Sequence, residues 1–204
     1  MMNLKWRKRM ALISLTKKTL FIVFMVLLTG AAQAQWSLNN DASTLSFVTV
    51  KADHVGEVHT FDRLSGSIDN RGNVEIIIEL ASVNTLIDIR NERMQNMLFE
   101  TNLFPEAKIT SDINLSAITA MSAGASESME VEFELDIHGA SNSYTADLVV
   151  TRLENGVIAS TSKPILVTAN THGLVEGVEA LREVAGLPSI SRAVPVTFTV
   201  IFDQ

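Results

Sequence analysis

Among the residues of this 204-residue chain that could take part in metal binding, the four histidines are considered first. His54 and His59 are five positions apart in a segment that we expect to be a loop, while His138 and His172 follow in turn-like segments. Histidine metal sites usually show a short motif such as HxH or HExxH, and neither occurs here. The sequence therefore predicts no metal site and favours histidines that face solvent or cap turns.

Nucleophilic catalysis has no better support. Serine is frequent, but the sequence contains neither the GxSxG nucleophile motif nor a glycine-rich phosphate loop. It contains no cysteine, which excludes thiolate chemistry and disulfides. The acidic residues fall on outward positions of predicted strands, where they form a solvated face. We predict no catalytic residues, no enzymatic activity and no cofactor, and an enzyme that acts on lipids is the weakest alternative.

Two arginines offer a different chemistry, the binding of an anionic or carbonyl head group. Arg90 and Arg93 lie three positions apart in RNERMQNMLF, so they are neighbours on the surface of a predicted helix. A pair of guanidinium groups beside an apolar face suits such a head group. The alternative is an ordinary solvated face, in which Glu92 or Glu100 pairs with the arginines.

The elements that must position these residues are mostly β-strands. In MEVEFELDI, residues 129–137, apolar and acidic residues alternate without exception, so one face of a strand is apolar and the other acidic. Similar patterns occupy residues 45–50, 74–80, 144–153 and 194–202, with a weaker strand candidate at 107–120. In each of these strands the apolar face must be covered, either by the protein's own core or by something that the protein binds.

Two segments change to helical spacing. Met94, Met97 and Leu98 follow the pattern i, i+3, i+4. Residues 174–185 also carry an apolar helical face, and a glycine and a proline end that helix in the usual order. Repeated antiparallel strands with two short helices predict a barrel or a sandwich.

Residues 1–34 read as a cleaved signal peptide. Six Lys and Arg precede or flank the apolar run Leu20–Leu28, and Ala32-Gln33-Ala34 supplies the small residues of a cleavage site. The run is about half of the roughly 20 residues that span a bilayer. We predict cleavage after Ala34, one domain over residues 35–204 and a periplasmic product. That product holds ten Lys and Arg against 23 Asp and Glu, a formal net charge of −13, so nucleic acid is not an expected partner.

Six motifs follow one another in the order of one known family. They are Trp36-Ser37-Leu38 with Ser43 to Phe47, Gly66 to Asp69 after Phe61, Leu80 to Thr85, Arg90 to Pro105, Leu135 to Gly139, and Ala185 to Val196. Together they resemble the YceI-like family, exported bacterial proteins associated with polyisoprenoid binding. Asn91-Glu92-Arg93 departs from the family's common Asp-x-His, and Ala169 to Gly173 departs from Arg-Ser-Asp-Phe-Gly. The identity of the head group is therefore left open.

The resemblance implies an all-β, lipocalin-like extended antiparallel barrel of about eight strands, with one or two short helices near its mouth and an apolar tunnel for an isoprenoid chain. The expected ligand-binding residues are Phe47, Phe61, Ile76, Ile78, Met94, Met97, Leu98, Phe104, Phe133, Leu135, Leu181 and Phe198. Arg90 and Arg93 are expected near the head group. The helix carrying Met94, Met97 and Leu98 is expected at the barrel mouth.

An eight-stranded barrel is wide enough either to be filled by its own side chains or to hold one small ligand. The sequence leaves two functions open on this point. One is a periplasmic carrier for an isoprenoid lipid, a quinone or a polyprenyl phosphate. The other is a stress-related or interaction protein with a closed core. The partners considered are the lipid, transient contact with the membrane or its proteins, and a second copy of the chain in a homodimer, with the oligomeric state left open.

Overall fold

The computed structural model describes residues 36–204, so the predicted leader and its cleavage site lie outside the described residues. The strands are β1 (Trp36–Leu38), β2 (Thr44–Lys51), β3 (Val55–Phe61), β4 (Leu64–Ile68), β5 (Asn73–Glu79), β6 (Val83–Asn84), β7 (Glu106–Asp112), β8 (Ser126–Ile137), β9 (Ala140–Arg152), β10 (Gly156–Thr161), β11 (Ile165–Thr168) and β12 (Ala193–Asp203). The helical elements are η1 (Asn40–Ala42), η2 (Leu80–Ser82), α2 (Asp88–Arg93), η3 (Met94–Leu98), α3 (Leu115–Ala120), η4 (Ala169–His172) and α4 (Val175–Val184). None of these helices has the length and hydropathy needed to cross a bilayer.

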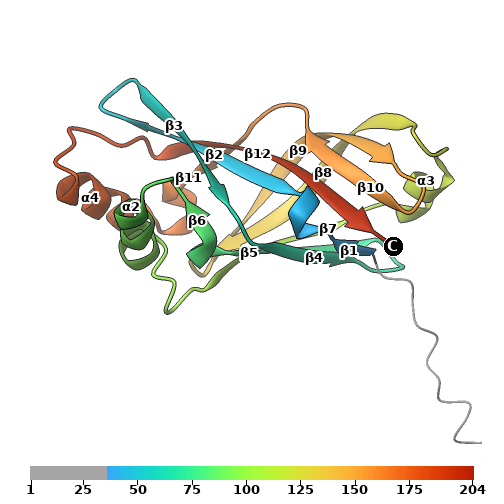
Figure 1. Cartoon of the computed structure of the whole chain (residues 1–204), viewed down its shortest axis with the longest axis horizontal. Helices are drawn as coiled ribbons and strands as arrows, with labels where there is room; N and C mark the ends of the chain where they lie inside the picture. Colours follow the sequence, from blue (N-terminus) through green and yellow to red (C-terminus); the bar gives the residue numbers. More distant parts are fainter. Residues whose placement is uncertain (1–35) are drawn as a thin grey trace, which may run out of the picture. The chain divides into compact units, whose positions relative to one another are not determined.

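Eight strands close into an antiparallel barrel, in the order β1, β4, β5, β7, β8, β9, β10 and β12 (Figure 1). Strand β12 closes the ring because it pairs with β10 along one edge and with β1 along the other. Farther along the second edge, β12 pairs with β2, which in turn forms a hairpin with β3. The predicted all-β barrel of about eight antiparallel strands is therefore confirmed.

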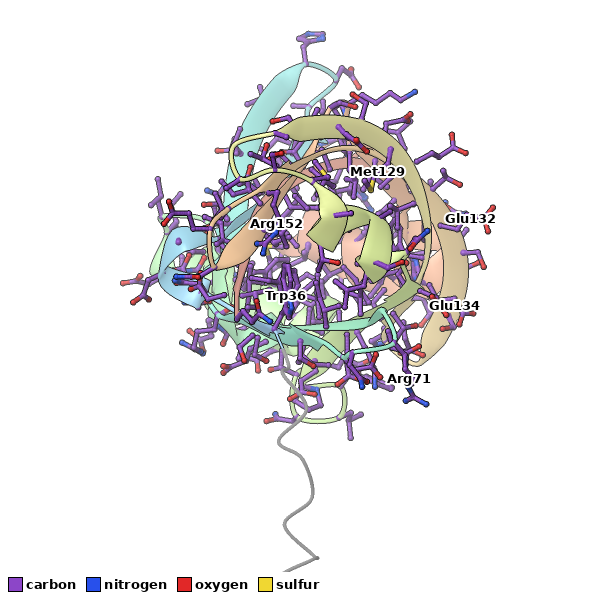
Figure 2. The ribbon with its side chains drawn as sticks, turned by 90° about the vertical axis from the view of Figure 1, so that its right-hand side faces the viewer. Trp36, Arg71, Met129, Glu132, Glu134 and Arg152 are labelled. Atoms are coloured by element: carbon purple, nitrogen blue, oxygen red, sulfur yellow. The ribbon has the colours of Figure 1, made fainter. Side chains whose placement is uncertain are left out.

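The β8 strand has the alternation that the sequence predicts. Leu135 is buried, while Glu132 and Glu134 are exposed. Figure 2 shows both glutamates pointing away from the ring of strands. The apolar face of this strand lines the interior and the acidic face lies in solvent, as expected from the two-residue period of a strand.

The weaker strand candidate at 107–120 is only half right. Strand β7 ends at Asp112, and the chain then forms the short helix α3. Asn114 caps this helix, since its side-chain oxygen accepts a hydrogen bond from the backbone N–H of Ala117 at 3.2 Å. A capping asparagine satisfies one of the unpaired donors of a helix start and so favours the change from strand to helix.

The barrel interior consists of two halves. The half under α3 is a closed core that includes Trp36, Ile76, Ile118 and Phe202. Figure 2 looks onto this end, with α3 in front and Trp36 and Arg152 inside the ring of strands. The Arg152 guanidinium carbon lies 5.2 Å from the centroid of the Trp36 ring, which is within cation–π range. The other half borders α2, η3 and α4, at the opposite end of the barrel in Figure 1.

The predicted helix at 90–99 begins as α2 and continues as the π-helical turn η3. The N–H of Phe99 donates to the carbonyl of Met94 at 2.9 Å, a bond that spans five residues. The buried side chains are consequently Met94, Leu98 and Phe99, at i, i+4 and i+5. Met97, predicted from regular helical spacing to share the inward face, is only partly buried. The wider π turn rotates it away from that face.

Candidate ligand-binding cavity

The half of the barrel beside α2 and α4 encloses a cavity. Its volume, counted as the space that the centre of a water molecule can reach, is about 280 Å³. A single water needs only roughly 10–15 Å³ by the same measure. Strands β2, β3, β5, β7, β8, β11 and β12 form its walls, and η3 and α4 cover it. This half of the barrel is therefore not filled by its own side chains.

Most of the predicted ligand-binding residues lie on the wall of this cavity. The apolar ones that line it are Phe47, Phe61, Ile78, Met94, Leu98, Phe133, Leu135, Leu181 and Phe198. Arg90 and Arg93 line it as well. The structure thus brings together residues from five separate strands and from the helical elements α2, η3 and α4, although ligand binding itself stays a prediction.

Three predicted residues do not line the cavity. Ile76, two residues before Ile78 on β5, points inward but belongs to the closed core under α3. Phe104 instead packs against the β8–β9 turn, where its ring centroid lies 4.4 Å from that of His138. Met97 is turned away by the π-helical turn. These three residues therefore lie away from the cavity wall, since residue spacing alone cannot place a side chain along the barrel axis.

The inward face of the β2–β3 hairpin changes from apolar to polar toward its tip. The cross-strand pairs on this face are Leu45–Phe61, Phe47–His59 and Thr49–Glu57, followed by Lys51. All seven side chains line the cavity. The hairpin lies at the same end of the barrel as α2 and α4 (Figure 1). The cavity is thus apolar in its interior and polar beside this hairpin.

An ion-pair network occupies the polar part. Glu57 Oε2 accepts from Lys51 Nζ at 2.6 Å and from Arg90 Nη1 at 2.7 Å. The hydrogen bond from Lys51, and after it the one from Arg90, lowers the pKa of the Glu57 carboxyl below its usual value, although burial opposes the effect. Arg90 Nη2 also donates to the backbone carbonyl of Thr85 at 2.8 Å. Arg90 is therefore fixed in place, and the alternative that it pairs with Glu92 or Glu100 is wrong.

Arg93 differs from Arg90. Its side chain lines the same cavity but makes no hydrogen bond or ion pair with other residues of the described range 36–204. Glu100, the partner considered from the sequence, instead pairs with His138, whose Nε2 lies 2.8 Å from Glu100 Oε2. The two arginines are therefore not an equivalent pair.

His59 is buried in the cavity wall, with 3% of its surface exposed. Its Nε2 lies 2.9 Å from Thr49 Oγ1, and its ring packs edge-on against Phe47. Burial, and secondarily the positive charge of Arg90, lowers the pKa of His59, so the imidazole is held in its neutral form. The prediction that His59 lies in a loop and faces solvent is wrong. The alternation of Glu57, His59 and Phe61 is the signal that could have identified this strand.

His172 is the second buried histidine, and it is fully satisfied. Its Nε2 lies 2.7 Å from the Tyr144 hydroxyl and its Nδ1 lies 2.9 Å from the Ala140 carbonyl. Because both ring nitrogens are used within the fold, we assign it a structural role. Within residues 36–204, no three His, Cys, Asp or Glu side chains lie close enough together to hold a metal ion.

Comparison with known protein families gives a result that agrees with this barrel fold. The model of the YceI-like domain matches residues 36–202. The chain belongs to the YceI-like family. A similar solved structure, a polyisoprenoid binding domain from Saccharophagus degradans implicated in plant cell wall breakdown, is 38% identical with a TM-score of 0.81, and the match covers 84% of this chain and 99% of that one.

Two more distant structures share the YceI-like fold. Burkholderia cenocepacia BcnA is 17% identical with a TM-score of 0.60, over 80% of this chain and 98% of that one. A mutant CJ YCEI protein made for nanotechnology applications is 14% identical with a TM-score of 0.51, over 72% of this chain and 84% of that one. No curated protein matches this YceI-like chain with significant similarity.

Proposed function

We propose that this YceI-like chain is a periplasmic binding or carrier protein for an isoprenoid lipid. The observation that carries the proposal is a largely apolar cavity whose charged lining residues lie on the β2–β3 hairpin and α2. An amphiphile with a long apolar tail and one polar end fits such a site. The 38%-identical Saccharophagus degradans structure, described as a polyisoprenoid binding domain, supports an isoprenoid as the tail.

Burial of the tail supplies enough free energy for such a function. Each buried methylene contributes about 0.8 kcal/mol, so one five-carbon isoprene unit contributes roughly 3–4 kcal/mol. Three buried units therefore reach about 10 kcal/mol before the costs of association and ordering are subtracted. Affinity comes from the tail in this scheme, and the polar residues select the head group.

The periplasmic location rests on the predicted leader. We expect the exported protein to begin at Gln35 and to be recovered in the soluble periplasmic fraction. N-terminal sequencing of the purified protein checks this. A product that keeps Met1 and stays with the membranes would contradict the location without affecting the binding function.

Loading of the lipid calls for contact with a membrane, because isoprenoid tails are poorly soluble in water. Three apolar residues beside Arg90 are exposed: Leu86 by 88%, Ile87 by 47% and Ile89 by 53%. Leu86 has a φ of +59°, which is rare for a bulky residue. The backbone that holds this side chain in its exposed position is therefore in an energetically unfavourable conformation. We assign these residues to bilayer contact during loading.

A transfer assay tests the membrane contact. Leu86→Ser/Ile89→Ser should slow the uptake of a prenyl quinone from phosphatidylethanolamine–phosphatidylglycerol vesicles, with unchanged affinity at equilibrium. Leu166→Ser, which removes another exposed leucine (62%) on β11, is the matched control and should leave uptake unchanged. Equal uptake rates for all three proteins would show that this segment does not load the lipid.

Native mass spectrometry tests the binding function itself. Protein purified from the periplasm should carry about one prenyl lipid per chain. Ile78→Trp should lose it, because Ile78 lies on the cavity wall and a larger ring there occupies the space of the tail. Glu132→Gln on the outer face should keep the lipid. A closed-core interaction protein would carry no lipid and would take up no added prenyl lipid, and that result would overturn the proposal.

A further inference from the structure

The outer surface of the barrel differs in charge from one side to the other. The outward positions of β8 and of the nearby β5 are acidic, namely Glu75, Glu130, Glu132, Glu134 and Asp136. Two carboxylates on this side, Glu75 and Asp147, pair with Lys108 and Lys163, which leaves the side acidic. Figure 2 shows Glu132 and Glu134 at the right of the barrel, whereas the β2–β3 hairpin lies at its upper left.

Four neighbouring strands away from this acidic side have an uncharged outward face. Because β11, β12, β2 and β3 pair in register, their outward side chains form rows across the sheet. One row is apolar and consists of Leu166, Pro195, Val48 and Val58. The next row, two residues farther along the strands, carries hydroxyl groups and consists of Thr197, Ser46 and Thr60. We call these two rows the uncharged wall.

The ends of the apolar row are the most exposed part of the uncharged wall. Val58 is 65% exposed and Leu166 is 62% exposed, and they lie on the two outer strands of the four. The charged residues Asp62, Lys163 and Arg192 follow or precede these strands and so lie outside the rows. A single exposed apolar residue is normal on a protein surface, but a contiguous apolar patch marks an interaction site.

The chemistry of the uncharged wall does not suit a membrane surface. Segments that bind at a bilayer interface typically use Lys and Arg for the lipid head groups, or Trp and Tyr at the boundary. The two rows contain none of these four residue types. The apolar residues that we assign to bilayer contact, Leu86, Ile87 and Ile89, lie on a different part of the chain. The uncharged wall is therefore better suited to a protein partner.

A second copy of this chain is the partner that the uncharged wall fits. A twofold interface brings the same patch of both copies together, so the patch must complement itself. Apolar side chains meet this condition, and so do Ser and Thr, because a hydroxyl both donates and accepts hydrogen bonds. The acidic side does not, because two copies would place carboxylates opposite each other. Since residues 35–204 carry a formal net charge of −13, the uncharged wall is a side on which two copies can meet without that repulsion.

We propose that this chain forms a twofold homodimer in which the uncharged walls of two copies pack face to face. Packed sheets lie about 10 Å apart, so Val58 and Leu166 are long enough to fill the space between the two walls. The inward residues of the same strands line the ligand cavity, which stays on the other face of each sheet. The inference goes beyond the proposed function and does not depend on lipid binding.

Sedimentation velocity of the mature protein at concentrations from about 2 to 200 µM tests the dimer. The wild type should change from monomer to dimer within this range. Val58→Glu/Leu166→Glu brings carboxylates of both copies together in the interface and should raise the dissociation constant by at least about 30-fold. Both side chains are mostly exposed, so the variant should fold, and its thermal unfolding checks this.

The matched control adds the same two charges outside the uncharged wall. Leu86 and Leu103 are 88% and 70% exposed, and neither belongs to the two rows. In about 0.15 M salt, charges more than about 8 Å apart are largely screened. Leu86→Glu/Leu103→Glu should therefore leave the dissociation constant unchanged within about twofold.

Mixing two charged variants tests the same contact with a gain of binding. Val58→Lys/Leu166→Lys should be monomeric by itself, as should Val58→Glu/Leu166→Glu. Native mass spectrometry of their mixture should show a heterodimer. This result is expected whether Val58 of one copy meets Val58 or Leu166 of the other, because every pair of facing charges is then opposite in sign. Misfolded variants could not give this result.

Three results would overturn the proposal. A wild type that is still monomeric at about 200 µM would show that the uncharged wall does not join two copies. A dimer that both glutamate variants weaken equally, or that neither weakens, would depend on net charge or on another surface. Charged variants that remain monomeric when they are mixed would exclude a face-to-face contact of the two walls.

Discussion

Phe133 and Glu132 are neighbours in β8 that face opposite sides of the barrel wall. The Phe133 ring lines the cavity and stacks against Tyr144, with 5.7 Å between ring centroids. Phe133→Glu removes this ring from the apolar interior and replaces it with a carboxylate that has no ion-pair partner there. We expect a loss of at least about 3 kcal/mol in the free energy of unfolding, measured by urea denaturation. Glu132→Gln, on the solvent face, should change it by less than about 0.5 kcal/mol. Similar losses for both would show that the two faces are misassigned.

The buried His59 predicts a pH dependence of stability. Its pKa is lowered in the folded protein by burial, then by Arg90, with Glu57 acting in the opposite sense and Lys51 in the same sense as Arg90. The unfolded chain binds a proton near pH 6.5, whereas the folded protein binds it only at lower pH. The stability contribution is therefore present above about pH 6.5 and is lost as the pH falls through the folded pKa.

The measurement compares wild type and His59→Gln between pH 8 and pH 5. The wild type should lose up to about 1.4 kcal/mol per pH unit more than the variant below pH 6.5, because only the wild type must bury a neutral imidazole. Carboxylates that titrate between pH 8 and pH 5 change the free energy of unfolding of the wild type and of His59→Gln by the same amount, so they cancel in the comparison. Parallel stability curves would mean that His59 titrates as it does in the unfolded chain.

The residues of the polar cavity wall illustrate what sequence cannot provide. Arg90 was identifiable as a candidate from its place beside an apolar helical face. Its partner Glu57 was not, because the two lie 33 positions apart and meet only when the β2–β3 hairpin folds beside α2. Glu57 and His59 also interrupt the apolar pattern of their strand, so the segment resembles a loop. Polar residues on an inward face form the polar part of the cavity wall, and the same residues make the strand that carries them hard to recognise in the sequence.

At the level of elements, α4 packs closely against η3 through Gly177. A Cβ at this position would lie 2.7 Å from the Met97 carbonyl oxygen and 2.8 Å from the Leu98 Cα. Gly177→Ala gains about 1 kcal/mol of helix propensity, but overpacking against backbone typically costs about 1–3 kcal/mol. We expect a net loss of stability in urea denaturation, since backbone cannot move aside as a flexible side chain does.

Gly56→Ala is the control for this substitution, because a Cβ at Gly56 meets no atom within 4 Å. It should be neutral or slightly stabilising. If Gly177→Ala were more stable than the wild type, helix propensity would outweigh the contact, and the close packing of α4 on η3 would be refuted. Val178 and Leu181 of α4 line the cavity, so a shifted helix should also change ligand affinity.

Element boundaries were predictable where a regular period continued to a turn or a helix stop. Strand β8 follows uninterrupted alternation, and β5 and β12 keep an apolar residue at every second position. Helix α4 ends before Gly186, as its sequence indicates. The π turn η3 was not predictable, because regular helical spacing places Met97 where the structure places Phe99. Such a turn depends on the bond from Phe99 to Met94 and on the packing of α4 against it, and neither is visible in local sequence.

At the scale of the whole described domain, the barrel combines two arrangements between which the sequence does not decide: one half is filled by its own side chains, and the other half contains a cavity. Ile76 and Ile78 follow the same alternation on β5, yet Ile76 is in the closed core and Ile78 lines the cavity. Periodicity identifies the inward face, but whether that face is filled depends on side chains from every other strand. The family resemblance correctly predicted the barrel, and only the assembled side chains divide it into a closed half and an open half.

Two buried alanines test this division directly. Ala107 on β7 is 1% exposed and lines the cavity, whereas Ala146 on β9 is 2% exposed and lies in the closed core. Ala146→Phe should cost about 1–3 kcal/mol or more, because a close-packed core has no space for the ring. Ala107→Phe should change the free energy of unfolding by less than about 1 kcal/mol, since the ring enters existing space and buries apolar surface. It should also abolish lipid binding in native mass spectrometry. Equal destabilisation by both substitutions would mean that the barrel is closed along its whole length in solution, and the carrier function would then fail with the cavity.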